Sequence, residues 1–228
     1  MSVSCVVGLQ WGDEGKGRVV DYLAQTADIV IRYQGGDNAG HTVVNEYGKF
    51  GLHILPSGIF NEETMNIVGA GTVVNFDRMH SEKEDIEKKI GRKLDNLFID
   101  ERAHIILPYH MALDGAEETK RSDSEKIGTT KRGIGPCYQD KAARSGIRAC
   151  DLLDENTLTK RLSAILPKKN RELEYYGLKT YTLEELLEKC REWKNEFGLK
   201  IIDTVPVVRE AVESNKNILL EGQLGIMR

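Results

Sequence analysis

The sequence predicts an α/β protein with a largely parallel central sheet and helices on both faces. Residues 3–9, "VSCVVGL", form a β-branched apolar run, which indicates a strand buried on both faces. A glycine-rich turn follows, and residues 18–27 then carry apolar side chains at helical spacing. Residues 28–34, "DIVIRYQ", indicate a second strand. This order starts a parallel sheet, because parallel strands need a long crossover connection.

The remaining elements continue the sheet and then become helical. Residues 66–75 and 97–101 indicate further strands, and residues 80–91 indicate a surface helix that ends at Gly91. Residues 151–214 are predicted to be mainly helical. The helices expected there span 157–166, 181–198 (with a capping box of Thr182 and Glu185) and 203–214, and a last strand spans 217–222.

We expect one domain over residues 1–228, since the sequence has no internal repeat and no linker that would separate two units. Residues 116–148 are charged and rich in glycine, with little periodicity. A polar stretch of this length inside a compact domain is usually functional. We therefore predict a mobile, substrate-binding loop region there.

Charge and hydropathy argue against nucleic-acid and membrane partners. The net charge is −4, and both signs are interspersed without a basic or acidic tail. No apolar run approaches the ~20 residues that span a bilayer, and no basic segment precedes the N-terminal apolar run, as a signal peptide would require. The four cysteines form no C-x-x-C motif, which predicts reduced thiols and a cytoplasmic location.

The first glycine-rich loop, residues 8–18 "GLQWGDEGKGR", has the composition of a phosphate-binding loop but matches neither standard pattern. For a Walker A motif, Gln10 stands where the first glycine belongs and Gly17 replaces the Ser or Thr that holds magnesium. The glycine order also differs from the dinucleotide fingerprint G-x-G-x-x-G. The loop nevertheless follows a strand and opens a helix, so its N–H groups and Lys16 suit an anion. The alternative is a tight turn without a ligand.

Asp13 is the unusual residue of this loop, because a carboxylate repels phosphate. It is tolerable beside a triphosphate if a divalent cation lies between them, and it could also accept a proton from a substrate. Glu14 could serve instead, and composition does not choose between the two.

Two further loops offer donors for a bound anion. In "QGGDNAGHT" (34–42), Asn38, His41 and Thr42 are donors, and His41 could act as an acid on an oxygen that gains charge. The alternative is a structural histidine. In "IGTTKRGIGP" (127–136), hydroxyl and basic side chains could bind a phosphate. Arg144 and Arg148 follow this loop, and the alternative is that they are solvated surface residues. No zinc site is expected, because the spacing of the remaining histidines does not suit zinc ligands; these are His53, His80, His104 and His110.

Five stretches together resemble the adenylosuccinate synthetase family. They are "QWGDEGKG" (10–17), "RYQGGDNAGHT" (32–42), "LHILPSGI" (52–59), "IGTTKRGIGPCYQDKAARSGIR" (127–148) and "DLL" (151–153), and they match in order and spacing over essentially the whole chain. The resemblance implies a P-loop-NTPase-like fold. It implies GTP-dependent ligation of L-aspartate to IMP, which gives adenylosuccinate, GDP and phosphate through 6-phosphoryl-IMP in AMP biosynthesis. Mg²⁺ is the implied cofactor, with GTP as co-substrate.

The resemblance also implies residue roles. Asp13 would be the base at N1 of IMP and a magnesium ligand together with the Gly40 carbonyl, His41 would be the acid, and Lys16 would hold phosphate. GTP would contact Gly12, Asp13, Glu14, Gly15, Lys16, Gly17, Arg18, Gly40, His41 and Thr42. IMP would contact Asp13, Glu14, Gly15, Lys16, Asn38, Ala39, Gly40, His41, Thr130 and Arg144. Arg144 would reach the IMP phosphate of a neighbouring subunit, which implies a homodimer.

The last residues depart from the family pattern. The family continues "EGAQG" into a long second half, whereas this chain reads "EGQLGIMR" and stops. We therefore expect a sheet that is truncated before it is complete, and the family's IMP-contacting glutamine is not assigned to Gln223. The alternative function is a catalytically incomplete fragment that binds IMP or another nucleotide. A generic GTPase switch is disfavoured, because the sequence has no N-K-x-D guanine motif.

Overall fold

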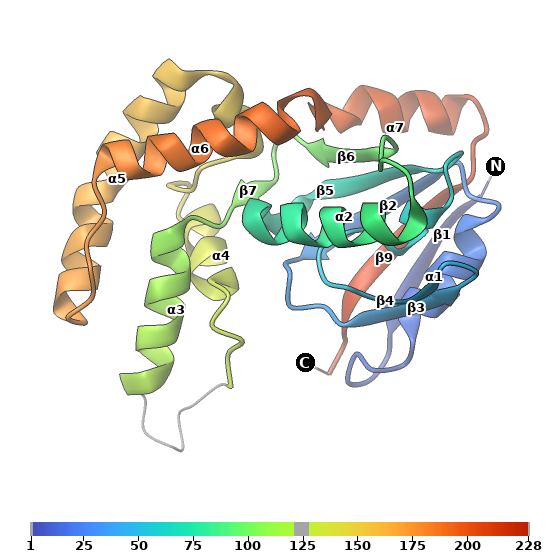
Figure 1. Ribbon diagram of the computed structural model, residues 1–228, viewed down its shortest axis with the longest axis horizontal. Helices are drawn as coiled ribbons and strands as arrows, with labels where there is room; N and C mark the ends of the chain where they lie inside the picture. The colour runs from blue at the N-terminus through green and yellow to red at the C-terminus, as the bar shows by residue number, and fades with distance from the viewer. Residues whose placement is uncertain (1, 121–127, 228) are drawn as a thin grey trace.

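The computed structural model describes residues 2–120 and 128–227, and its centre is a seven-stranded sheet in the order β1-β9-β2-β5-β6-β8, with β7 beside β5. Every strand pair in this sheet is parallel. The strands are β1 (Val3–Gly8), β2 (Ile29–Gly35), β5 (Met65–Val74), β6 (Leu97–Asp100), β7 (His104–Ile105), β8 (Ile201–Ile202) and β9 (Ile218–Gly225). The α/β class and the parallel sheet predicted from the sequence are confirmed (Figure 1).

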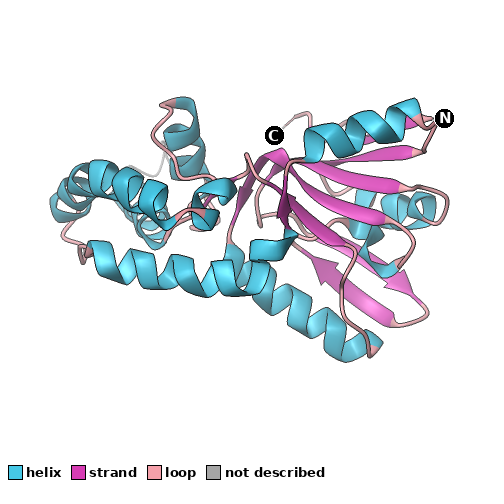
Figure 2. Ribbon diagram, turned by 90° about the horizontal axis from the view of Figure 1, so that it is seen from above, coloured by secondary structure: helices cyan, strands magenta, loops and turns pink. Residues whose placement is uncertain are grey.

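Helices cover both faces of the sheet, as predicted. Val30 packs with Val20 of α1 (Lys16–Ala24), whereas the adjacent Ile29 packs with Ala211 of α7 (Thr204–Glu213). Neighbouring residues of a strand point to opposite faces, so these two helices lie on opposite sides. Val68 of β5 packs with Phe76 of α2 (Phe76–Ile90). The helices on either side of the strands are visible in Figure 2.

A group of helices extends the same core beside the sheet. In Figure 1 they lie on the left, next to β6 and β7. The group consists of α3 (Pro108–Lys120), α4 (Ile134–Ala142), α5 (Glu155–Tyr175) and α6 (Leu183–Phe197), with short 3-10 turns at Ala149–Leu153 and Gly198–Lys200. A further 3-10 turn at Ser57–Phe60 packs against α1 and β5. The predicted capping box is present: Thr182 and Glu185 exchange side-chain and backbone hydrogen bonds at the start of α6.

A small antiparallel hairpin of β3 (His41–Asn45) and β4 (Gly48–Leu52) was not predicted. Residues 35–42 were expected to form a loop only, but His41 and Thr42 already belong to β3. Val43 points into the core and Val44 is exposed, so the hairpin is half-buried. A two-residue connection joins its strands, with Gly48 at φ +120°.

The expectation of an irregular polar stretch at 116–148 was wrong in part. Its first residues belong to α3, and residues 134–142 form α4. The helix was missed because glycine and charge obscure its buried side, which consists of Pro136, Cys137 and Asp140. Residues 121–127 of this predicted mobile region lie outside the described residues.

The last strand runs further than predicted and lies inside the sheet. β9 continues through Gln223 and Leu224, and it pairs with β1 on one side and β2 on the other. Its last residues therefore meet the ends of both neighbouring strands. Among the described residues, no helix is long and apolar enough to cross a membrane.

Candidate functional site

The three predicted loops meet at the carboxyl ends of β1, β2 and β9. This edge is where open α/β sheets bind their ligands. A cavity of about 510 Å³ lies there. Its lining includes Val7, Tyr33, Gly35, Asn38, Tyr138 and Gln223. The topology therefore brings segments far apart in the sequence to one cavity.

The first loop turns sharply from β1 into α1. Gly12 and Gly15 have φ of +91° and +85°, a left-handed conformation that favours glycine. The Lys16 side chain is buried, and its Nζ lies 3.2 Å from the carbonyl oxygen of Gly12 and 3.3 Å from Oε2 of Glu14. The ammonium group is thus held within the loop, beside the start of a helix.

The Glu14 carboxylate occupies the donors of this loop. Its Oε1 accepts hydrogen bonds from the backbone N–H groups of Gln10 at 2.8 Å and Gly12 at 3.1 Å. Hydrogen bonds from its own N–H and from Gly12 are the main causes that lower the pKa of Glu14 to about 2, and Lys16 contributes. The loop therefore binds an oxyanion already, in the form of one of its own side chains.

Asp13 lies exposed on the same loop, next to this carboxylate. Within residues 2–120 and 128–227, the exposed Asp13 side chain makes no hydrogen bond or ion pair. The predicted second ligand, the Gly40 carbonyl, belongs to an exposed residue of the second loop. Two oxygen donors of this kind suit Mg²⁺, which usually keeps several waters and takes few protein ligands. The described residues contain no cluster of three or more His, Cys, Asp or Glu side chains that could hold a metal.

The second loop brings His41 against the first. The His41 side chain is buried at the start of β3, and a Cβ added to Gly17 would lie 2.6 Å from His41 Cβ. Only a glycine lets α1 approach the histidine this closely. The expected acid and the expected phosphate loop are therefore direct neighbours, although Gly17 and His41 are 24 positions apart in the sequence.

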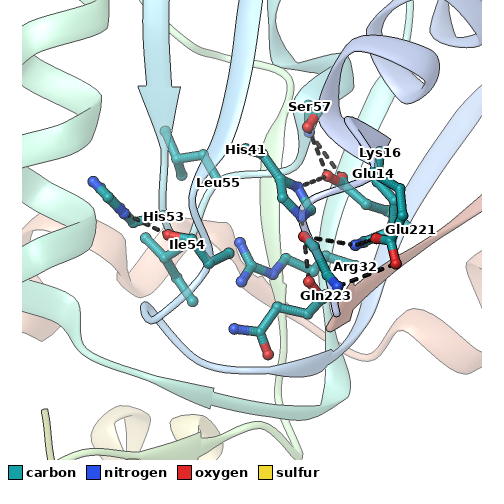
Figure 3. A network of polar contacts seen from close by, with 12 residues as sticks. Glu14, Lys16, Arg32, His41, His53, Ile54, Leu55, Ser57, Glu221 and Gln223 are labelled. Carbon is teal, nitrogen blue, oxygen red and sulfur yellow. Dashed lines mark hydrogen bonds and ion pairs between the residues drawn. The ribbon is translucent and has the colours of Figure 1, made fainter. Parts of the chain in front are cut away.

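His41 is held by groups from β9 (Figure 3). Its Nδ1 lies 2.6 Å from Oε1 of Glu221, and its Nε2 lies 3.4 Å from the carbonyl oxygen of Gln223. Glu221 is fully buried and also accepts hydrogen bonds from Ser57, from the N–H at 2.8 Å and from the hydroxyl at 2.6 Å. Burial alone would raise the pKa of the Glu221 carboxyl, but the hydrogen bonds from His41 and Ser57 and the charge of Arg32 lower it below its usual value.

Gln223 connects β9 to the second loop. Its Nε2 donates to Oδ1 of Asn38 and to the carbonyl oxygen of Gly36. A side chain at Gly35, whose φ is +90°, would collide with Gln223. The glutamine is buried in the site, at a position where the sequence did not assign a role.

The third loop and helix α4 after it both contact the second loop. Arg132 of the third loop donates to the carbonyl oxygen of Asp37, and the hydroxyl of Tyr138 in α4 accepts from the N–H of Gly35 at 2.9 Å. Thr130 is exposed on this loop. Arg144 is exposed after α4, at φ +59°, and among the described residues it makes no hydrogen bond or ion pair with the three loops. The structure thus brings together the predicted site residues of the first two loops, but not Arg144.

Sequence reasoning missed the buried charges that support the site. Three buried charged residues lie beneath the loops: Glu221, Arg32 and Glu82. Arg32 has no exposed surface. The signal was a charged residue inside an otherwise apolar strand, as in "IVIRYQ" and "NILLEG". Charged side chains are almost never fully buried unless they are paired, so Arg32 and Glu221 each indicated a partner, whereas Glu82, in helix α2, carried no such signal.

The family model of adenylosuccinate synthetase matches residues 5–228. This chain belongs to the adenylosuccinate synthetase family. It is 46% identical to adenylosuccinate synthetase 1 of Methanosarcina acetivorans and to adenylosuccinate synthetases of Dehalococcoides mccartyi and Listeria monocytogenes, over 100% of this chain and 53% of each relative. The chain thus spans about half the length of the curated adenylosuccinate synthetases it matches.

Two solved structures resemble the fold. The fully ligated adenylosuccinate synthetase of Plasmodium falciparum superposes with a TM-score of 0.86 at 34% identity, covering 98% of this chain and 51% of that one. A cyanophage S-2L succinoaminodeoxyadenylate synthetase, bound to dGMP and dATP, has a TM-score of 0.62 at 20% identity, which supports the fold alone. The predicted family and its fold are therefore confirmed.

Proposed function

We propose that this chain carries out, or contributes to, the GTP-dependent ligation of L-aspartate to IMP in AMP biosynthesis. The products would be adenylosuccinate, GDP and phosphate, with 6-phosphoryl-IMP as the intermediate. The observation that carries the proposal is the contact of Gly17 with His41, because it sets the phosphate loop directly beside an imidazole. An exposed carboxylate, Asp13, lies on the same loop.

The resemblance to the family implies the chemistry proposed for each residue, and the surroundings of the residue are compatible with it. Asp13, which is exposed, accepts the N1 proton of IMP, and the purine O6 then attacks the γ-phosphoryl group of GTP. Lys16 neutralises phosphate charge, and His41 donates a hydrogen bond or proton to the phosphoryl group and its oxygen. The amine of aspartate displaces phosphate from C6. Asp13 and the Gly40 carbonyl would hold Mg²⁺, which would neutralise phosphate charge.

The two nucleotides are assigned to the meeting point of the loops. The proposed GTP contacts are Gly12, Asp13, Glu14, Gly15, Lys16, Gly17, Arg18, Gly40, His41 and Thr42. The proposed IMP contacts are Asp13, Glu14, Gly15, Lys16, Asn38, Ala39, Gly40, His41, Thr130 and Arg144. Arg144 would act across a homodimer interface, which its exposed position after α4 permits. A cytoplasmic location is proposed with this role.

Direct assay tests the proposal. The 228-residue chain is incubated with GTP, IMP, L-aspartate and Mg²⁺, and adenylosuccinate is followed by absorbance and mass spectrometry. We expect product that depends on all four additions, and less product from His41→Asn. Absence of adenylosuccinate with all four additions would contradict the proposal.

The second candidate is an IMP- or nucleotide-binding chain without turnover. It is considered because the chain corresponds to 53% of the length of the relatives, so the match by itself does not assign turnover to these 228 residues. Calorimetric titration separates the two candidates. IMP binding without adenylosuccinate supports the second, and turnover by the 228-residue chain alone rules it out.

A further inference from the structure

Glu221 has no role in the reaction proposed above, yet its environment is specialised. The side chain has no exposed surface, and its two oxygens accept three hydrogen bonds. Two of them come from Ser57 and one comes from Nδ1 of His41 at 2.6 Å. An ionised carboxylate in the protein interior is costly unless it is paired and fully hydrogen-bonded. Its surroundings meet that condition, so the carboxylate is retained at a cost that an apolar residue would avoid.

We propose that Glu221 is the positioning residue for His41: its carboxylate fixes the Nδ1 proton and thereby directs Nε2 as the donor in phosphoryl transfer. The inference rests on the role proposed for His41. A hydrogen bond at one ring nitrogen sets the tautomer and orientation of the imidazole, and hence the chemistry at the other nitrogen. Glu221 itself acts only through His41.

The second ring nitrogen supports this assignment. Nε2 faces the carbonyl oxygen of Gln223 at 3.4 Å, so both ring nitrogens face acceptor oxygens. A doubly protonated imidazole has a donor on each nitrogen and satisfies both acceptors. The long Nε2 contact is the weaker of the two, so a phosphoryl oxygen can compete for that donor while Glu221 keeps Nδ1.

The strand order explains how Glu221 reaches a histidine that lies 180 positions earlier. β9 lies between β1 and β2, and Glu221 pairs in register with Arg32 of β2. His41 sits at the start of β3, where the absence of a side chain at Gly17 lets α1 pack closely against its Cα and Cβ. The Glu221 carboxylate then contacts the imidazole at Nδ1.

Nuclear magnetic resonance of the Nδ1 proton tests the proposal without requiring turnover. In histidine-¹⁵N-labelled protein we expect a strongly low-field proton bonded to Nδ1 of His41, as a short charge-assisted hydrogen bond produces. Loss of this signal in His41→Asn assigns it. Absence of any such signal in the unsubstituted protein overturns the proposal, whether or not the chain turns over.

Two substitutions separate positioning from general support of the fold. Glu221→Gln removes the charge, so the Nδ1 signal should move to higher field. Glu82→Gln is the matched control, because Glu82 is also a buried carboxylate with three backbone donors, from His53, Ile54 and Leu55, but it does not touch His41. In Glu82→Gln the signal of the His41 Nδ1 proton should stay in place. Equal shifts in the two variants, or no shift in Glu221→Gln, overturn the proposal.

Steady-state kinetics provide the second measurement. We expect kcat of Glu221→Gln to fall roughly 10²- to 10³-fold, with KM for IMP and GTP changing by less than about threefold. Glu221→Asp keeps the charge and should recover part of both kcat and the low-field signal. A rise in KM with unchanged kcat contradicts positioning. If no variant and no unsubstituted protein forms adenylosuccinate, the proposed function fails, and the Nδ1 signal still decides the role of Glu221.

Discussion

Buried charges organise the candidate site beneath its exposed loops. Arg32 donates to the carbonyl oxygen of Gly36, and Glu82 accepts from three consecutive N–H groups before the Ser57–Phe60 turn. Each charge ties a loop to the sheet or to a helix. Sequence patterns identified the loop residues, since glycine, lysine and histidine stand out there. They did not identify the supporting charges, because pairing partners such as Glu221 and His41 are far apart in the chain.

Asp13 is the residue whose substitution tests the chemistry most directly. Asn has the same shape but accepts protons far more weakly, so Asp13→Asn should lower turnover by about 10²- to 10⁴-fold. Affinity for IMP should change by less than about threefold, because Lys16 and the glycine backbone remain. Single-turnover kinetics and calorimetry measure the two effects separately. Weakened IMP binding with unchanged turnover would mean that Asp13 positions substrate instead.

The segment from β1 through α1 to β3 depends on the absence of one side chain. A Cβ at Gly17 would lie 2.6 Å from Cβ and 3.1 Å from Cα of His41. Neither atom can move without moving backbone. The glycine-rich sequence predicted a tight turn there, whereas the reason for Gly17 is a contact with a strand that sequence patterns read as a loop. Local periodicity identifies elements, but close approach between elements depends on tertiary packing.

Gly17→Ala should therefore push α1 away from β3. We expect a loss of about 1–3 kcal/mol in the free energy of unfolding, as for other overpacked sites. Urea denaturation measures it, and the Nδ1 signal of His41 should broaden or move. Gly135→Ala is the matched control, since Gly135 is also the second residue of a helix, α4, and has no atom within 4 Å of an added Cβ.

The control variant should be neutral or slightly more stable, because alanine favours a helix over glycine by up to about 1 kcal/mol. Equal destabilisation of the two variants would show that Gly17 is needed only for backbone freedom. Full stability of Gly17→Ala would mean that α1 and β3 separate without cost.

One continuous core joins the sheet to the helical group. Val68 and Ile99 of the strands belong to the same buried cluster as Leu162 of α5 and Trp193 of α6. The parallel sheet was predictable from apolar runs and glycine turns. The arrangement of the helical group was not, because it depends on buried polar contacts between helices.

A buried chain of polar side chains fastens the helical group. Oδ2 of Asp140 in α4 lies 2.9 Å from Nε2 of His110 in α3, and Oδ1 of Asp140 lies 2.8 Å from Nζ of Lys169 in α5. His110 accepts a hydrogen bond from the N–H of Leu107 at 2.9 Å, which leaves its other nitrogen to donate to Asp140. Burial lowers the pKa of His110 below its usual value, although Asp140 opposes this. The histidine is therefore suited to a neutral, structural role.

The stability of the molecule should depend on pH through Asp21 of α1. Partial burial, with the nearby charge of Glu46, raises the pKa of Asp21 from 3.8 to about 6. The folded state consequently binds this proton more tightly than the unfolded chain does. Protonated Asp21 therefore contributes favourably to the free energy of unfolding below about pH 4, and this contribution is lost as the pH rises through about 6.

Asp21→Asn removes a charge that the folded state disfavours at neutral pH. We expect the free energy of unfolding to rise by about 1 kcal/mol at pH 7.5, after allowance for solvent screening, and by much less near pH 4.5. Urea denaturation at the two pH values measures the difference. Glu188→Gln, on the exposed side of α6, removes one charge elsewhere and serves as the control. An equal gain at both pH values, or the same gain in the control, would mean that net charge and not the burial of Asp21 sets the pH dependence.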